Sequence, residues 1–193
     1  MRLFLDANVV TYVAFFEPFL VEGPTELRAC VALWNSLQGT SPDADLRREI
    51  EALRILYLLD EQSHFDWLCS DRGIAEIQRI RSPEKRNAHS DLLGRLLEHR
   101  RDVYAESGDR VQVATIEERL RVLFPNLPSR MESDALQFCE GELLDAYYFV
   151  TNDRAFSRTA AASGSDLVSC RPSELPFVAK HLTGEIEDLW PRE

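Results

Sequence analysis

The alternation of short apolar runs with longer helical patterns constrains this chain more than any other feature. The apolar runs lie at residues 2–5, 65–69, 147–150 and 166–170, and polar residues or a proline end each one. Between the runs, apolar residues recur every three or four positions, which is the period of a helix with one buried face. Strands that alternate with helices pair in parallel. The sequence therefore predicts an α/β fold with a central parallel sheet flanked by helices.

Length and composition predict one globular domain. The chain has 193 residues, of which 45% are hydrophobic and 28% charged, and it contains no repeat or long linker. We therefore expect a single domain that spans residues 1–193. Asp6 interrupts the first apolar stretch too early for a signal peptide, and no run reaches the length of a membrane span. These two features predict a cytoplasmic protein with no membrane partner.

The charge balance excludes one class of nucleic-acid binder. Lys and Arg number 22 and Asp and Glu number 33, so the net charge is −11. A generally basic protein that binds phosphates through many cations is therefore excluded. An acidic chain is nevertheless compatible with nucleic-acid chemistry, because a cluster of carboxylates that binds divalent cations is itself acidic.

Four acidic residues are placed to meet at one edge of the expected sheet. Asp6 ends the first apolar run, and Asp153 follows the third. Glu76 lies in the helix after the second run, and Asp134 lies in the first turn of the helix before the third. Each acid has an alternative role, because acids are also favoured at the start of a helix. Together, however, four carboxylates would repel one another without a cation, and oxygen ligands suit Mg²⁺ or Mn²⁺.

The motifs around these acids resemble those of the PIN-domain nucleases. They are FLDANVV with Asp6, IAEI with Glu76, SDAL with Asp134 and FVTNDRAF with Asp153, and the resemblance extends to the closing SCRPSEL. The resemblance implies a three-layer PIN-like fold and an endoribonuclease that hydrolyses RNA phosphodiester bonds. One or two Mg²⁺ or Mn²⁺ ions would be held by the implied catalytic and metal-binding residues Asp6, Glu76, Asp134 and Asp153.

The same resemblance assigns supporting roles. Asn8 and Thr151 would support the metal ligands, and Arg79, Arg81 and Arg154 would bind the RNA. Many relatives are toxins paired with a small antitoxin protein, so an antitoxin and a homodimer are the expected partners. The chain departs from the family at Ala7, where a hydroxyl is common, and in a helical insertion at about residues 25–60. That insertion contains two turn-like segments, at residues 38–45 and 58–65.

Two other functions stay open. A catalytically inactive PIN-like module would bind RNA or support an assembly, and only a metal or activity measurement separates it from the nuclease. An aspartyl-phosphate phosphatase or receiver domain would use Asp6, but it needs a lysine near the sheet edge. The only lysines are Lys85 and Lys180, and neither follows an expected strand. We therefore place the phosphatase below the other two.

Overall fold

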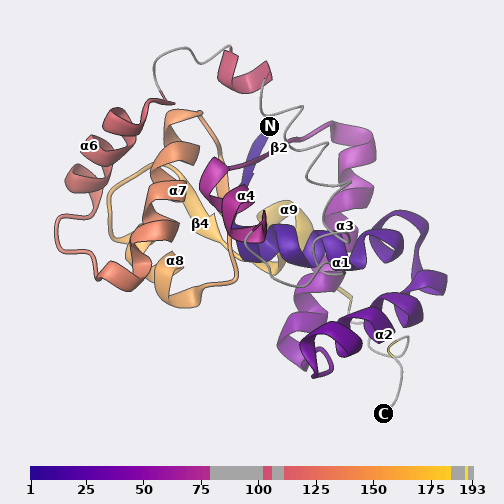
Figure 1. Cartoon of the computed structure of the whole chain (residues 1–193). Helices are drawn as coiled ribbons and strands as arrows, with labels where there is room; N and C mark the ends of the chain where they lie inside the picture. The colour runs from indigo at the N-terminus through magenta and orange to yellow at the C-terminus, as the bar shows by residue number, and fades with distance from the viewer. Residues whose placement is uncertain (79–101, 106–110, 184–189, 191–193) are drawn as a thin grey trace. The chain divides into compact units, whose positions relative to one another are not determined.

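The computed structural model describes residues 1–78, 102–105, 111–183 and 190 of the chain (Figure 1). It divides the chain into two compact units, each made of two separate stretches. Unit 1 contains Met1–Val10 and Phe65–Cys170, and unit 2 contains Thr11–His64 and Arg171–Glu193. The assignment of residues 1–193 to a single PIN-like domain stays a prediction.

Unit 1 is built on a sheet of four parallel strands. The strands are β1 (Arg2–Leu5), β2 (Asp66–Cys69), β3 (Tyr148–Val150) and β4 (Val168–Cys170), in the order β2-β1-β3-β4. Leu5, the last residue of β1, pairs with Cys69 and Val150, which end β2 and β3. The predicted α/β class and the predicted parallel sheet are therefore confirmed, and the strands end at a common edge.

Helices connect these strands. Within the described part of unit 1 they include α4 (Asp71–Gln78), α6 (Val113–Leu123), α7 (Glu132–Leu143) and α8 (Arg154–Ala161), with a short 3-10 turn at Ser129–Met131. Four residues separate the end of α7 from the start of β3, so α7 ends near the amino end of that strand. Its first turn, which contains Asp134, therefore points toward the carboxyl edge of the sheet.

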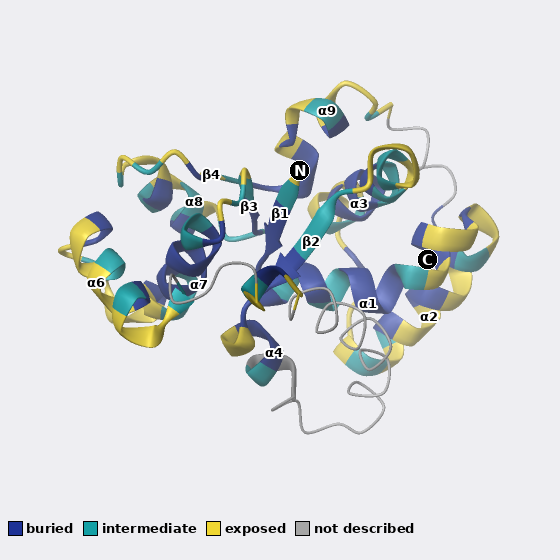
Figure 2. Ribbon diagram, turned by 90° about the horizontal axis from the view of Figure 1, so that it is seen from above, coloured by how far each residue is buried: buried dark blue, intermediate teal, exposed yellow. Residues whose placement is uncertain are grey.

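An aromatic cluster forms the core of unit 1. Phe4, Phe138, Phe149 and Phe156 are fully buried, and the ring centroids of Phe138, Phe149 and Phe156 lie 5.6–5.8 Å apart. Figure 2 shows the same distribution, with β1 and β3 buried and α6 largely exposed. α7 packs closely against β1 at Gly141, where an added Cβ would lie 3.0 Å from the Phe4 ring. This contact holds α7 directly against the sheet.

Unit 2 is helical in its described part. α1 (Ala7–Glu22) begins in unit 1 and continues here, followed by a 3-10 turn (Pro24–Glu26), α2 (Leu27–Gln38) and α3 (Ala44–Ser63). A further 3-10 turn (Pro172–Glu174) and α9 (Pro176–Ala179) come from the C-terminal stretch. None of the helices in the described ranges is long and apolar enough to cross a membrane.

The segment predicted to be helical, at about residues 25–60, contains α2 and all but the last three residues of α3. The turn expected at residues 38–45 is confirmed, because Gly39 ends α2 in a left-handed conformation and Asp43 caps α3. Of the second turn-like segment, at residues 58–65, only the last two residues lie outside α3. α3 continues to Ser63 and ends at His64, because the segment from residue 58 to residue 63 has no glycine or proline to interrupt it.

Candidate functional site at the carboxyl edge of the sheet

The strand order identifies one position in unit 1 as the place where a ligand is expected. β1 leads to β2 on one side of the sheet, and β3 leads to β4 on the other. In open α/β sheets, ligands bind outside the carboxyl ends of the strands where the connections diverge in this way. That position is the gap between the ends of β1 and β3, and Asp6 and Thr151 are the first residues after these two strands.

The carboxylate of Asp6 is buried and held by two side chains. Asp6 is 2% exposed, and its Oδ2 accepts hydrogen bonds from Asn8 Nδ2 at 2.5 Å and Thr151 Oγ1 at 2.7 Å. Its backbone N–H donates to the carbonyl oxygen of Val150 at 3.0 Å. Hydrogen bonds to a carboxylate are among the stronger ones in proteins. The orientation of Asp6 is therefore set by residues from both strand ends.

Asp153 is connected to the same network and also caps a helix. Its Oδ1 accepts hydrogen bonds from the backbone N–H groups of Ala155 at 2.7 Å and Phe156 at 2.9 Å, at the start of α8. Its own N–H donates to Thr151 Oγ1 at 3.1 Å. Thr151 thus links Asp6 to Asp153. The capping role uses one oxygen, and Asp153 Oδ2 makes no hydrogen bond to any residue that the structure describes.

Asn8 completes the link between the two strand ends. Its Nδ2 donates to Asp6, while its Oδ1 accepts a hydrogen bond from the backbone N–H of Asn152 at 3.3 Å. The structure therefore brings together four of the residues expected at the site, namely Asp6, Asn8, Thr151 and Asp153.

The other expected residues lie on α4, α7 and α8 or outside the described part of the chain. Asp134 is half-buried in the first turn of α7. Glu76 lies on α4, but its side chain is outside the described part, as are Arg79 and Arg81. Arg154 is exposed as the first residue of α8. Among the described residues, no group of three or more His, Cys, Asp or Glu side chains is arranged to hold a metal ion. The four-acid metal site stays a prediction.

Two carboxamides at this edge were not expected from the sequence. Gln137, on α7, is fully buried, and neither its Oε1 nor its Nε2 has a hydrogen-bond partner among the described residues. The same is true of Asn152 Oδ1 and Nδ2 in that part of the chain. The sequence does contain one signal for Gln137, because it is a polar residue within the otherwise apolar segment ALQFC, three residues after Asp134.

The chemistry of the side chains suits a hard divalent cation. Asp6 and Asp153 supply carboxylate oxygens, and Asn8, Thr151 and Asn152 add amide and hydroxyl oxygens. Mg²⁺ is often bound by only one or two carboxylates, because it keeps several of its water molecules. Two carboxylates and two buried, unpartnered carboxamides are therefore compatible with a hydrated cation at this edge.

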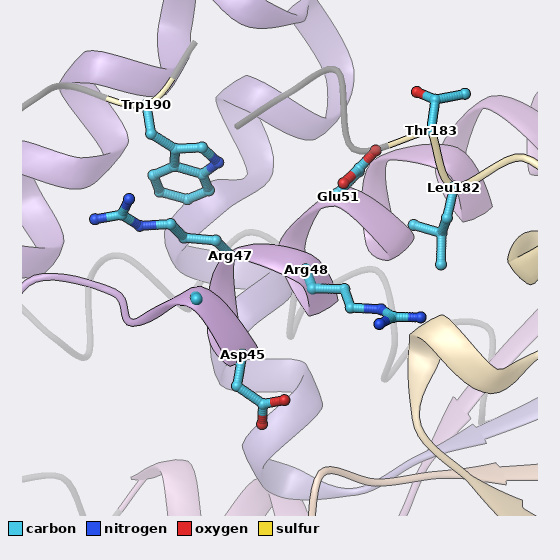
Figure 3. A pocket seen from close by; sticks show the side chains of 8 residues that line it. Asp45, Arg47, Arg48, Glu51, Leu182, Thr183 and Trp190 are labelled. Carbon is cyan, nitrogen blue, oxygen red and sulfur yellow. The ribbon is translucent and has the colours of Figure 1, made fainter. Parts of the chain in front are cut away.

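Unit 2 contains a separate cavity of about 520 Å³ beside the start of α3 (Figure 3). Arg47 lies over the Trp190 ring, 5.4 Å from its centroid, and Arg48 extends from the same helix. Asp45 and Glu51 also line the cavity. Two acidic and two basic side chains line the same cavity. Their charges therefore favour neither an anionic nor a cationic ligand.

Comparisons of the chain with protein-family models, curated proteins and solved structures find no match.

Proposed function

We propose that the chain is a divalent-metal-dependent endoribonuclease with a three-layer PIN-like fold, which hydrolyses phosphodiester bonds of RNA. One observation carries the proposal: Asp6 and Asp153 follow neighbouring parallel strands and are linked through Thr151 at the expected ligand position. Asp6, Asp134, Asp153 and Glu76 would hold Mg²⁺ or Mn²⁺. When bound, such a cation lowers the pKa of a water molecule and stabilises charge on a phosphate.

The chain's own residues would orient these groups. Thr151 and Asn8 donate to Oδ2 of Asp6 and so fix the orientation in which that carboxylate would meet a cation. The start of α8 carries the positive end of the helix dipole, and Arg154 is exposed there. Because the Asp153 carboxylate already accepts from the first N–H groups of α8, the positive charge of Arg154 is the feature that would favour the approach of a phosphate. A small antitoxin partner, a homodimer and a cytoplasmic location belong to the same proposal.

The catalytically inactive RNA-binding or assembly module is the second candidate. The described residues contain no group of three acids arranged for a metal, and Asp153 has a structural role as the cap of α8. The aspartyl-phosphate enzyme has less support. Lys180 follows α9 and not a strand, and Lys85 lies outside the described residues.

Cleavage of a mixed RNA substrate tests the nuclease. Purified protein is assayed with Mn²⁺ or Mg²⁺ and with EDTA, beside the variant Asp153→Asn, which retains an acceptor for the α8 cap. The matched control is Asp145→Asn, since Asp145 is exposed and precedes β3 at the opposite end of the strand. We expect metal-dependent cleavage that falls at least about 100-fold in Asp153→Asn and is unchanged in the control. Equal activity in wild type and Asp153→Asn would favour the inactive module.

A further inference from the structure

The buried carboxamide of Gln137 has no structural explanation in its surroundings. Its side chain is fully buried, and both of its polar ends lack hydrogen-bond partners among the described residues. Buried polar groups are nearly always partnered, and an unpartnered one costs stability. An apolar side chain of the same size would avoid this cost. The residue is therefore a candidate for a functional role that requires the carboxamide.

The carboxamide lies at the carboxyl edge of the sheet. A Cβ added to Gly73 would lie 3.0 Å from Gln137 Oε1, 3.3 Å from Ser70 Oγ and 3.7 Å from Ala7 Cβ. Ser70 is the first residue after β2, and Ala7 directly follows Asp6. Gln137 Oε1 is therefore beside the ends of β1 and β2.

A second carboxamide lies at the end of β3. Asn152 follows Thr151, and both polar atoms of its side chain are buried without a partner in the described part of the chain. Asn152 follows β3, which pairs with β1, and Gln137 of α7 lies near Ala7 and Ser70, which follow β1 and β2, so both carboxamides lie at the carboxyl edge of the sheet. Two unpartnered carboxamides at the edge that also carries the buried Asp6 are candidates for contacts with a polar ligand there.

We propose that Gln137 is a positioning residue that holds the hydration shell of a divalent cation at the Asp6–Asp153 edge. A carboxamide has one acceptor and one donor group, and water molecules satisfy both. Mg²⁺ and Mn²⁺ bring such water molecules, because they bind through few protein ligands. The inference rests on the proposed function, since it takes the cation of that site as the ligand. Groups that contact metal ligands from outside commonly change metal affinity 10–100-fold.

Metal binding without RNA tests this role. Gln137→Met keeps the size of the side chain and removes both polar ends, Gln137→Glu keeps an acceptor and adds a charge, and Leu136→Met is the control on the same helix. Mn²⁺ affinity is measured by calorimetric titration, and the melting temperature is measured in EDTA and in Mn²⁺. We expect Gln137→Met to melt higher in EDTA and to bind Mn²⁺ about 10–100-fold more weakly.

Gln137→Glu should melt lower than wild type in EDTA and recover in Mn²⁺, because the cation neutralises its buried carboxylate. Leu136→Met should change neither property by a comparable amount. If wild type binds Mn²⁺ and Gln137→Met binds it equally well, or if Gln137→Met is unstable in EDTA, the role of Gln137 is overturned while the proposed nuclease stands. If wild type binds no Mn²⁺, both proposals fail.

Discussion

At the scale of single residues, Arg171 forms ion pairs with two carboxylates of α3. Its guanidinium donates to both oxygens of Asp45, at 3.0 and 2.7 Å, and lies 3.0 Å from Glu49 Oε1. Glu49 is fully buried and also accepts hydrogen bonds from the N–H and hydroxyl of Ser173, at 2.9 and 2.7 Å. Burial raises the pKa of Glu49, and the bonds to Ser173 and the charge of Arg171 offset this effect only in part.

Replacing Arg171 with methionine should therefore destabilise the protein strongly. Removing one partner of a buried ion pair typically costs about 3–5 kcal/mol, because the other charge is left uncompensated. The cost should shrink as the pH falls, since a carboxyl whose pKa is raised by folding favours the folded state in its protonated form. Urea unfolding at pH 7 and pH 5 measures both effects. The exposed Arg48→Met is the control and should change stability by less than about 0.5 kcal/mol.

Thr151 tests the link between Asp6 and Asp153. Thr151→Val keeps the shape of the side chain but removes the donor to Asp6 and the acceptor for the Asp153 N–H. We expect a loss of about 1–3 kcal/mol in the free energy of unfolding, because Asp6 is buried. Thr151→Ser keeps the hydroxyl and should recover most of the loss. An unchanged free energy of unfolding in Thr151→Val would contradict the prediction, because that variant keeps the methyl group and loses only the hydroxyl.

At the scale of elements, the strands were predictable because apolar, β-branched and aromatic residues concentrate in short runs. Each predicted strand matches an observed one to within a residue or two, and the exposed Tyr147 marks one such difference. The expected parallel pairing then predicted that Asp6 and Asp153 lie at the same edge of the sheet. The roles of Gln137 and Asn152 were not predictable, because whether a polar atom has a partner depends on contacts between segments far apart in the sequence.

Glu142 connects elements of unit 1, because it lies on α7 and binds both Arg119 of α6 and Ser165 before β4. Arg119 Nη2 donates to Glu142 Oε1 at 2.7 Å, and Ser165 Oγ donates to the same oxygen at 2.5 Å. Burial alone would raise the pKa of Glu142, but the hydrogen bonds from Arg119 and Ser165 outweigh it and lower the pKa below its ordinary value.

The stability contributed by Glu142 should therefore depend on pH. A carboxyl whose pKa is lowered by folding contributes stability above its unfolded pKa of about 4.3, and this contribution is lost as the pH falls through the folded value. We expect Glu142→Gln to lose about 1 kcal/mol or less at pH 7, because Arg119 is partly exposed to solvent. Thermal unfolding of wild type and variant should converge near pH 3. A difference that is constant across this range would contradict the assignment.

At the scale of the whole molecule, the division into two units was not predictable. Each unit combines two stretches that are distant in the sequence, and one boundary falls inside α1, between Val10 and Thr11. Composition and periodicity report on local structure, so a boundary within a continuous helix leaves no mark on them. The C-terminal stretch joins unit 2 through the contacts of Arg171 and Ser173 with α3, which the sequence alone does not reveal.

The net charge of −11 predicts how the activity of the proposed nuclease depends on salt. RNA is a polyanion, so the protein's overall field opposes its approach, and salt screens this repulsion. At saturating Mn²⁺, kcat/KM should therefore rise or stay level between about 20 and about 150 mM KCl, where the Debye length shrinks to about 8 Å. A basic nuclease would instead lose affinity steeply over this range.

Charge variants on α6 separate the overall field from local contacts. Glu117→Gln combined with Glu118→Gln removes two negative charges from exposed positions. It should raise kcat/KM at low salt and flatten the salt dependence, because both changes reduce the repulsion of RNA. A steep fall in kcat/KM with salt in the wild type would contradict the prediction. It would instead indicate that a local basic surface, such as Arg79, Arg81 and Arg154, dominates the encounter with RNA.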